Sequence, residues 1–207
     1  LRKKILPQFL GSVQKSLSCR MTATRRFMNN LFLIGYRCTG KTSAGRTLAA
    51  KLGWIFVDSD RVITVEIGCS IAEFIAANGW AAFRETERKV IIRLSEMDRQ
   101  VVAAGGGAVI ADENVERMRS SGKVIWLQAS PHTIRRRMQA DAGTAVNRPS
   151  LTGQGSLEEI AAVLDERKPL YAGAAHHLID TDDLNTDEVV EKIIEIIESD
   201  LKTDPAG

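Results

Sequence analysis

The sequence contains little cysteine and no closely spaced cysteine pair. Cys19, Cys38 and Cys69 lie far apart, and no histidine accompanies them at metal-ligand spacing. This argues against a zinc site and against a disulfide framework, and it indicates a reducing compartment. The chain also lacks an apolar run of about 18 residues, the length that a membrane-spanning helix needs. We therefore expect a soluble protein with no membrane partner.

Acidic residues are absent from the first 30 positions, which carry seven Lys or Arg residues. Because the whole chain has a formal charge of only +2, the remainder is mildly acidic, and this disfavours nucleic acid as a partner. We interpret residues 1–30 as a disordered, dispensable appendage. Three interpretations of this segment remain open: an organelle transit peptide, an extension from an upstream reading frame, or a disordered tail. We expect a cytoplasmic protein, with an organelle as the alternative if the segment is a transit peptide.

Between residues 31 and 201, short apolar runs alternate with helical patterns, which is typical of a single α/β domain with a parallel sheet. Residues 202–207 are expected to form a C-terminal tail. Strands are expected at 31–34, 54–57, 101–104, 123–127 and 177–179. Helices are expected from 42 to 52, over 60–98 with breaks near Gly68 and Asn78-Gly79, and over 112–120, 131–139, 157–168 and 186–201, the last with Thr186 as its N-cap.

A phosphate-binding pattern follows the first apolar run. Residues 35–42 read Gly-Tyr-Arg-Cys-Thr-Gly-Lys-Thr and fit G-x-x-x-x-G-K-[ST]. Gly35 and Gly40 would let the backbone approach a triphosphate, Lys41 would reach the β- and γ-phosphates, and the Thr42 hydroxyl would bind Mg²⁺. A glycine-punctuated turn is the alternative, but the flanking strand and helix favour an ATP- or GTP-dependent enzyme.

Further candidates follow other predicted strands, whose carboxyl ends share one edge of a parallel sheet. Asp58 and Asp60 follow the second strand, so one carboxylate can serve Mg²⁺ while the other serves a second ligand. Gly105-Gly106-Gly107 follow the third strand and leave bare backbone for a small substrate. The Asn-Lys-x-Asp pattern of guanine-specific GTPases is absent, which favours ATP.

Residues 141–156 are rich in loop-forming residues around Arg148 and are expected to form a mobile segment. Arg84 and Arg167 lie in helical segments where periodicity alone predicts exposed charge. The three histidines have no nucleophile or metal partner nearby, so we expect them to be structural or exposed.

Taken together, six motifs in this order resemble shikimate kinase. They are the phosphate loop at 35–42, Asp-x-Asp at 58–60, Phe-Arg-x-x-Glu at 83–87, the triple glycine at 105–107, Arg-Pro at 148–149 and Arg-x-Pro-Leu-Tyr at 167–171. The resemblance covers about residues 30–200. It implies a three-layer α/β/α P-loop kinase fold like that of nucleoside monophosphate kinases, with a five-stranded parallel sheet.

The resemblance also implies a substrate-binding region at about 60–90 and a mobile lid at about 141–156. The implied reaction transfers the γ-phosphate of ATP to the 3-hydroxyl of shikimate. By the resemblance, Arg84, Gly106 and Arg167 would hold the substrate carboxylate and ring, with Gly105 and Gly107 beside them. Asp60 would hold the substrate hydroxyls, and Thr42 and Asp58 would hold Mg²⁺. Lys41, Asp60 and Arg148 would take part in catalysis, with Arg148 approaching from the lid. Planar arginine forks suit a carboxylate, which agrees with these roles.

We assign the nucleotide site to the phosphate loop and to one arginine of a later helix. Its candidate residues are Gly35, Arg37, Cys38, Thr39, Gly40, Lys41, Thr42, Ser43 and Arg136. Cys38 departs from the family pattern, which often has glycine there, so the loop is more constrained and ATP affinity is in question. Mg²⁺ is the expected cofactor, ATP and shikimate the expected substrates, and a monomer the expected state.

Two other functions remain open from the sequence alone. One is a related small-molecule kinase, such as a gluconate or nucleoside monophosphate kinase. The other is a nucleotide-binding regulator without turnover. A regulator would need neither an acceptor aspartate such as Asp60 nor an arginine such as Arg148, which favours a working enzyme.

Overall fold

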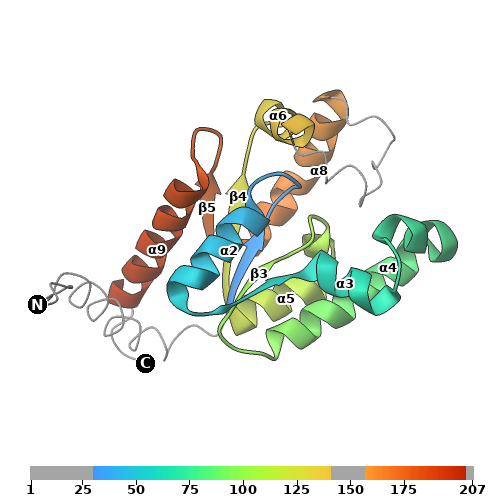
Figure 1. The fold of residues 1–207 in the computed structure, drawn as a ribbon, viewed down its shortest axis with the longest axis horizontal. Coiled ribbons are helices and arrows are strands. Elements are labelled where there is room, and N and C mark those ends of the chain that lie inside the picture. Colours follow the sequence, from blue (N-terminus) through green and yellow to red (C-terminus); the bar gives the residue numbers. More distant parts are fainter. Residues whose placement is uncertain (1–29, 141–156, 204–207) are drawn as a thin grey trace, which may run out of the picture.

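Five parallel strands form the central layer of the protein (Figure 1). The computed structural model describes residues 30–140 and 157–203. The strands are β1 (Asn30–Ile34), β2 (Ile55–Asp58), β3 (Gln100–Ala103), β4 (Gly122–Gln128) and β5 (His177–Asp180). Their order in the sheet is β2-β3-β1-β4-β5, so β1 lies at the centre and its carboxyl end opens into the phosphate loop.

Helices cover both faces of the sheet, because the central strands are apolar on both sides. Leu31 and Leu33 face α2 (Lys41–Leu52) and α9 (Thr186–Thr203), and Phe32 and Ile34 face the opposite layer. The opposite layer contains α3 (Ser59–Ile67), α4 (Ile71–Ser95), α5 (Asp112–Ser121) and α8 (Leu157–Ala174). The remaining described helices are the short η1 (Ala108–Ile110) and α6 (Pro131–Ala140). The expected three-layer architecture is confirmed.

The first strand begins one residue earlier than expected. Asn30 is fully buried, and its side-chain oxygen accepts a hydrogen bond from the Gln100 backbone at 3.1 Å. Asn30 therefore belongs to the domain and not to the appendage. Residues 1–29 and 204–207 lie outside the described residues, so the predictions about the two termini stay predictions.

The helical region after β2 is interrupted where the sequence predicts. The helix α3 ends at Gly68, which has a φ of +71°, and α4 contains a non-helical residue at Gly79, with a φ of +79°. Only glycine adopts such angles readily, so both breaks follow from the residue type. The break at Gly68 turns the chain so that α3 and α4 form two sides of the pocket described below.

The helix expected to end at residue 168 continues to Ala174, through Pro169. Proline removes one backbone donor and normally ends a helix. Here Tyr171 and Ala174 are fully buried in the core on the α4 side of the sheet. Their burial compensates for the missing hydrogen bond and keeps the last turn helical.

The final helix has Asn185 as its N-cap and not Thr186. The Asn185 side-chain oxygen accepts hydrogen bonds from the backbones of Asp187 at 2.9 Å and Glu188 at 3.1 Å. The Glu188 carboxylate accepts in return from the Asn185 backbone at 2.7 Å, which completes a capping box. The prediction chose the wrong one of two adjacent cap-forming residues.

The histidines have structural or exposed positions, as expected. His132 is exposed at the start of α6. His176 accepts a hydrogen bond from the Val124 backbone at 3.0 Å, and His177 pairs with Asp200 at 3.0 Å. Both contacts lie at the β4 and β5 edge of the sheet.

Within the described residues, no single helix is long and apolar enough to cross a membrane, although α3 and α4 pass that test together as a pair bent by 88°.

Candidate active site

The phosphate loop has the backbone geometry that its two glycines permit. Gly35 has a φ of +134°, and a side chain there would collide with the Leu127 carbonyl. Gly40, with a φ of +95°, is the residue before α2. The loop therefore turns sharply at both ends and brings backbone N–H groups and the positive end of α2 to one place, which is a favourable site for an anion.

Lys41 is held inside this loop. Its side chain is nearly buried, and its ammonium donates hydrogen bonds to the carbonyls of Gly35 at 2.8 Å and Tyr36 at 2.6 Å. The loop thus fixes a cation in its own concavity, where phosphate groups of a nucleotide would lie.

Thr42 and Asp58 form a pair with the chemistry of a Mg²⁺ site. The Thr42 hydroxyl donates to one Asp58 carboxylate oxygen at 3.0 Å, and the other oxygen caps α3 through the Asp60 backbone at 3.1 Å. The described residues contain no cluster of three or more His, Cys, Asp or Glu side chains that could hold a metal alone. Mg²⁺ commonly takes only one or two protein oxygens and completes its shell with phosphates and water, so this pair fits it.

Cys38 adopts a left-handed backbone conformation, with a φ of +59°. A side chain in this region costs roughly 1–2 kcal/mol relative to glycine, which explains why glycine is frequent here. The loop keeps its form around Cys38. The expected constraint is therefore local backbone strain, and its effect on ATP affinity stays a prediction.

The arginine of α6 that contacts the phosphate loop is Arg137, and the role of Arg136 at the nucleotide site stays a prediction. The Arg137 guanidinium donates to the Cys38 carbonyl at 3.4 Å and to the Thr181 hydroxyl at 3.0 Å, whereas Arg136 is exposed. The two adjacent arginines have different surroundings, because one step along a helix rotates a side chain by about 100°. Arg137 ties α6, the phosphate loop and the segment after β5 together.

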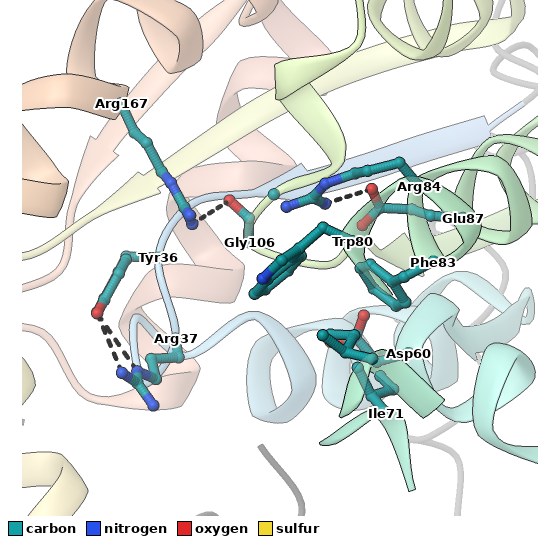
Figure 2. A pocket seen from close by; sticks show the side chains of 12 residues that line it. Tyr36, Arg37, Asp60, Ile71, Trp80, Phe83, Arg84, Glu87, Gly106 and Arg167 are labelled. Atoms are coloured by element: carbon teal, nitrogen blue, oxygen red, sulfur yellow. Dashed lines mark hydrogen bonds and ion pairs between the residues drawn. The ribbon is translucent and has the colours of Figure 1, made fainter. Parts of the chain in front are cut away.

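A pocket opens beside the phosphate loop (Figure 2). It is lined by Tyr36, Arg37, Asp60, Ile71, Ile75, Trp80, Phe83, Arg84, Glu87, Gly106, Gly107 and Arg167. These residues come from the loop after β1, from α3, α4 and α8, and from the glycines after β3. Three arginines and two acidic residues in one small pocket indicate a ligand that is both anionic and polar.

Arg84 is fixed on the pocket wall by Glu87, one turn along α4. The two side chains form an ion pair of 2.6 Å, in which Glu87 is almost fully buried and Arg84 remains partly exposed. Burial raises the pKa of the Glu87 carboxyl, and the Arg84 guanidinium opposes that rise. Periodicity alone predicted an exposed Arg84. The useful signal was the spacing of Arg84 and Glu87, which places both side chains on one face of the helix.

Aromatic rings complete this wall. The Arg84 guanidinium lies 5.4 Å from the Trp80 ring centre and 5.2 Å from that of Phe83. The two rings pack edge to face at 5.9 Å. They restrict the rotamers of Arg84 and leave the exposed part of its guanidinium facing the pocket, as Figure 2 shows. Neither aromatic residue was among the predicted site residues.

The triple glycine allows close approach of side chains from other elements. A side chain at Gly105 would meet the Asp60 carboxylate at 2.5 Å, and one at Gly107 would meet the Arg84 guanidinium at 2.5 Å. The Gly105 backbone donates to the Ser59 hydroxyl at 2.9 Å. Gly106 and Gly107 line the pocket, whereas Gly105 does not, and its lack of a side chain leaves room for the Asp60 carboxylate.

Arg167 enters the pocket from α8 and donates to the Gly106 carbonyl at 3.2 Å. The pocket therefore brings together Asp60, Arg84, Gly106 and Arg167 as the resemblance implied. Arg37, predicted for the nucleotide, also lines it, and its guanidinium lies 5.5 Å from the Tyr36 ring centre.

Ser43, predicted for the nucleotide site, is exposed in the first turn of α2. Arg148 and the expected lid lie outside the described residues, so their roles stay predictions.

A nucleotide-binding loop beside a separate, arginine-lined pocket places the protein in the class of P-loop kinases that act on small molecules. Comparison with known proteins agrees. A model of the shikimate kinase family matches residues 37–198. The shikimate kinase of Syntrophus aciditrophicus is 41% identical over 188 residues, which cover 87% of this chain and 96% of that protein. The shikimate kinase of Symbiobacterium thermophilum is 42% identical over 166 residues, covering 80% and 94%.

Solved structures give the same result. The shikimate kinase of Acinetobacter baumannii, determined in complex with shikimate, has a TM-score of 0.79 and 30% identity, and the alignment covers 87% of this chain and 98% of that one. The chain belongs to the shikimate kinase family.

Proposed function

We propose that this protein carries out the reaction of its family, the ATP-dependent phosphorylation of the 3-hydroxyl of shikimate. The observation that carries the proposal is the meeting of Arg84, Arg167 and Asp60 in one pocket beside the phosphate loop. The two cations suit a carboxylate, and the carboxylate of Asp60 suits a hydroxyl. Shikimate carries both groups on one small ring.

The substrate carboxylate would lie between Arg84 and Arg167, which approach from α4 and α8. A guanidinium can donate two parallel hydrogen bonds to a carboxylate, and such charge-assisted bonds are stronger than neutral ones. Glu87 already holds one side of Arg84, so little side-chain freedom remains to be lost when substrate binds. This arrangement favours acidic acceptors over sugars and nucleosides.

The acceptor hydroxyl would lie near Asp60, at the start of α3. In the reaction, the hydroxyl oxygen forms a bond to the γ-phosphorus of ATP while the bond from that phosphorus to the β,γ-bridging oxygen breaks. ADP leaves, and Asp60 accepts the hydroxyl proton. Lys41 stabilises the negative charge that develops on the transferred group.

Thr42 and Asp58 would hold Mg²⁺ through their side-chain oxygens, beside the phosphates. The ion would neutralise charge on the β- and γ-phosphate oxygens. The proposal includes bound Mg²⁺, a cytoplasmic location and a monomeric state, and it infers them from the family membership and from the sequence.

The proposal is tested by an ADP-release assay on the full chain with a panel of acceptors: shikimate, its methyl ester, gluconate and nucleoside monophosphates. We expect turnover with shikimate and a marked rise in KM for the ester, because the ester lacks the charge that the arginines bind. Turnover with gluconate or a nucleotide alone would contradict the proposal. Equal KM values for shikimate and its ester would show that the arginines do not bind the carboxylate.

A further inference from the structure

The hydroxyl of Tyr171 is the second donor on a carbonyl that Arg167 also uses. It donates to the Gly106 carbonyl at 2.6 Å, and Arg167 donates to the same oxygen at 3.2 Å. The two side chains are four residues apart on α8 and so lie on one face of the helix. Tyr171 is not itself a lining residue of the pocket.

Tyr171 is held in place independently of any ligand. The side chain is fully buried, and its ring stacks on Trp126 in β4 with a centre-to-centre distance of 5.5 Å. Burial raises the pKa of the phenol to about 12, so the hydroxyl keeps its proton and remains a donor. The Tyr171 hydroxyl is therefore placed to donate to Gly106, with or without a ligand in the pocket.

Arg167, in contrast, has a second task in the proposed reaction. A bidentate contact with a carboxylate through both terminal nitrogens would draw the Nη1 donor of Arg167 away from Gly106 or share it with the substrate. Without another donor, the carbonyl of Gly106, a half-buried residue that lines the pocket, would then lose its protein partner, which is unfavourable. With Tyr171 present, the carbonyl stays bonded when Arg167 moves.

We propose that Tyr171 is a positioning residue for the acceptor: it holds the Gly106 carbonyl so that the Arg167 guanidinium is available to the substrate carboxylate. The inference rests on the proposed function of the pocket. A positioning role differs from a purely structural one because it predicts a change in the KM for shikimate only, and only while Arg167 is present.

The test is Tyr171→Phe, which keeps the ring and its stacking on Trp126 and removes only the hydroxyl. Loss of one hydrogen bond of ordinary strength should raise the KM for shikimate by about 3- to 10-fold. We expect kcat to stay within about 2-fold and the KM for ATP to stay unchanged. A lower kcat with an unchanged shikimate KM would overturn the inference. So would a variant that fails to fold, judged by circular dichroism, because the hydroxyl would then be a requirement for folding.

Ser95→Ala is the control outside the nucleotide site and the pocket. Ser95 is the last residue of α4, and its hydroxyl donates to the Ile91 carbonyl at 2.8 Å. Removing this hydroxyl should leave the KM for shikimate unchanged. An equal rise in both variants would point to general loosening of the fold and would contradict a specific role for Tyr171.

A double-mutant cycle makes the test specific to Arg167. In an Arg167→Ala background, Tyr171→Phe should have no further effect on the KM for shikimate. Independent, additive effects would overturn the inference. The wild-type rate in the same assay tests the proposed function separately: no turnover of shikimate by the wild-type chain would reject the function, whereas a normal wild-type rate with additive variants would reject only the role of Tyr171.

Discussion

Glu87 and Arg84 form a 2.6 Å ion pair in which the acid is buried and the base faces the pocket. A buried charge is usually unfavourable for stability unless it has a partner. Here the pair has a geometric consequence, because it fixes a cation where an anionic acceptor would bind. The same pair should therefore contribute to binding more than to folding.

Glu87→Gln tests whether the ion pair contributes to binding more than to folding. The amide keeps a hydrogen-bond acceptor for Arg84 but removes the charge, so we expect the KM for shikimate to rise several-fold. Burial raises the pKa of Glu87, which means that its ionised form is disfavoured in the folded state. The free energy of unfolding near pH 7 should therefore stay the same or increase in the variant.

Glu85→Gln is the control for that measurement, since Glu85 lies in the same helix but pairs on the surface with Arg88 and Lys89. Its KM values should match those of the wild type. A large loss of stability in Glu87→Gln with an unchanged KM would show that the ion pair serves the fold.

Arg84→Ala and Arg167→Ala should each weaken acceptor binding. Removal of a charged hydrogen bond costs about 1.5–3 kcal/mol, which corresponds to a rise of roughly 10- to 100-fold in the KM for shikimate. The KM for ATP should change little. Arg88→Ala is the control on α4, because Arg88 pairs with Glu85 and Glu113 away from the pocket. If the shikimate KM is the same in all three variants, the acceptor site lies elsewhere.

Lys41→Ala should nearly abolish turnover. Loss of a cation beside the transferred phosphoryl group lowers kcat by on the order of 100- to 1,000-fold. Lys51→Ala, at the exposed end of the same helix, should keep wild-type kcat. A Lys41→Ala variant with near-normal kcat would remove the phosphate loop from the mechanism.

His176 should make stability depend on pH. Its ring nitrogen accepts the Val124 N–H, and burial, with help from nearby Arg119 and Lys123, lowers its pKa. The unfolded chain therefore binds a proton at His176 more readily than the folded chain does. The contribution of His176 to the free energy of unfolding is present above the ordinary histidine pKa of about 6.5, and it is lost as pH falls through the lower folded-state pKa.

Urea unfolding between about pH 8 and pH 5 measures this effect. The stability of the wild type should fall towards pH 5, and His176→Asn should flatten that part of the curve. The exposed His132 provides the control, His132→Asn, which should follow the wild-type curve. Parallel curves for all three proteins would show that His176 does not titrate with folding.

The layers and the phosphate loop could be predicted because they depend on local pattern. Leu31 to Ile34 are apolar at every position, which predicts a strand buried on both faces, and the spacing of Gly35, Gly40 and Lys41 carries its own geometry. The carboxyl ends of parallel strands share one edge of a sheet, and this rule correctly predicts that Asp58, Asp60 and the triple glycine lie near one another.

Other features depend on tertiary contacts that local pattern does not contain. The helix α8 continues through Pro169 because Tyr171 packs into the core. Arg137, and not Arg136, reaches the phosphate loop because of the rotation of α6. Arg37 lies in the loop sequence yet also lines the pocket beside Tyr36. The outcomes for α8 and for Arg137 are decided by long-range packing.

Phosphoryl transfer to shikimate is tested most directly by identifying the product. The purified full chain is incubated with ATP, Mg²⁺ and shikimate, and the mixture is followed by phosphorus NMR. We expect ADP and a phosphate ester at the 3-position of shikimate to accumulate in equal amounts. ADP with free phosphate and unmodified shikimate would contradict the proposed function.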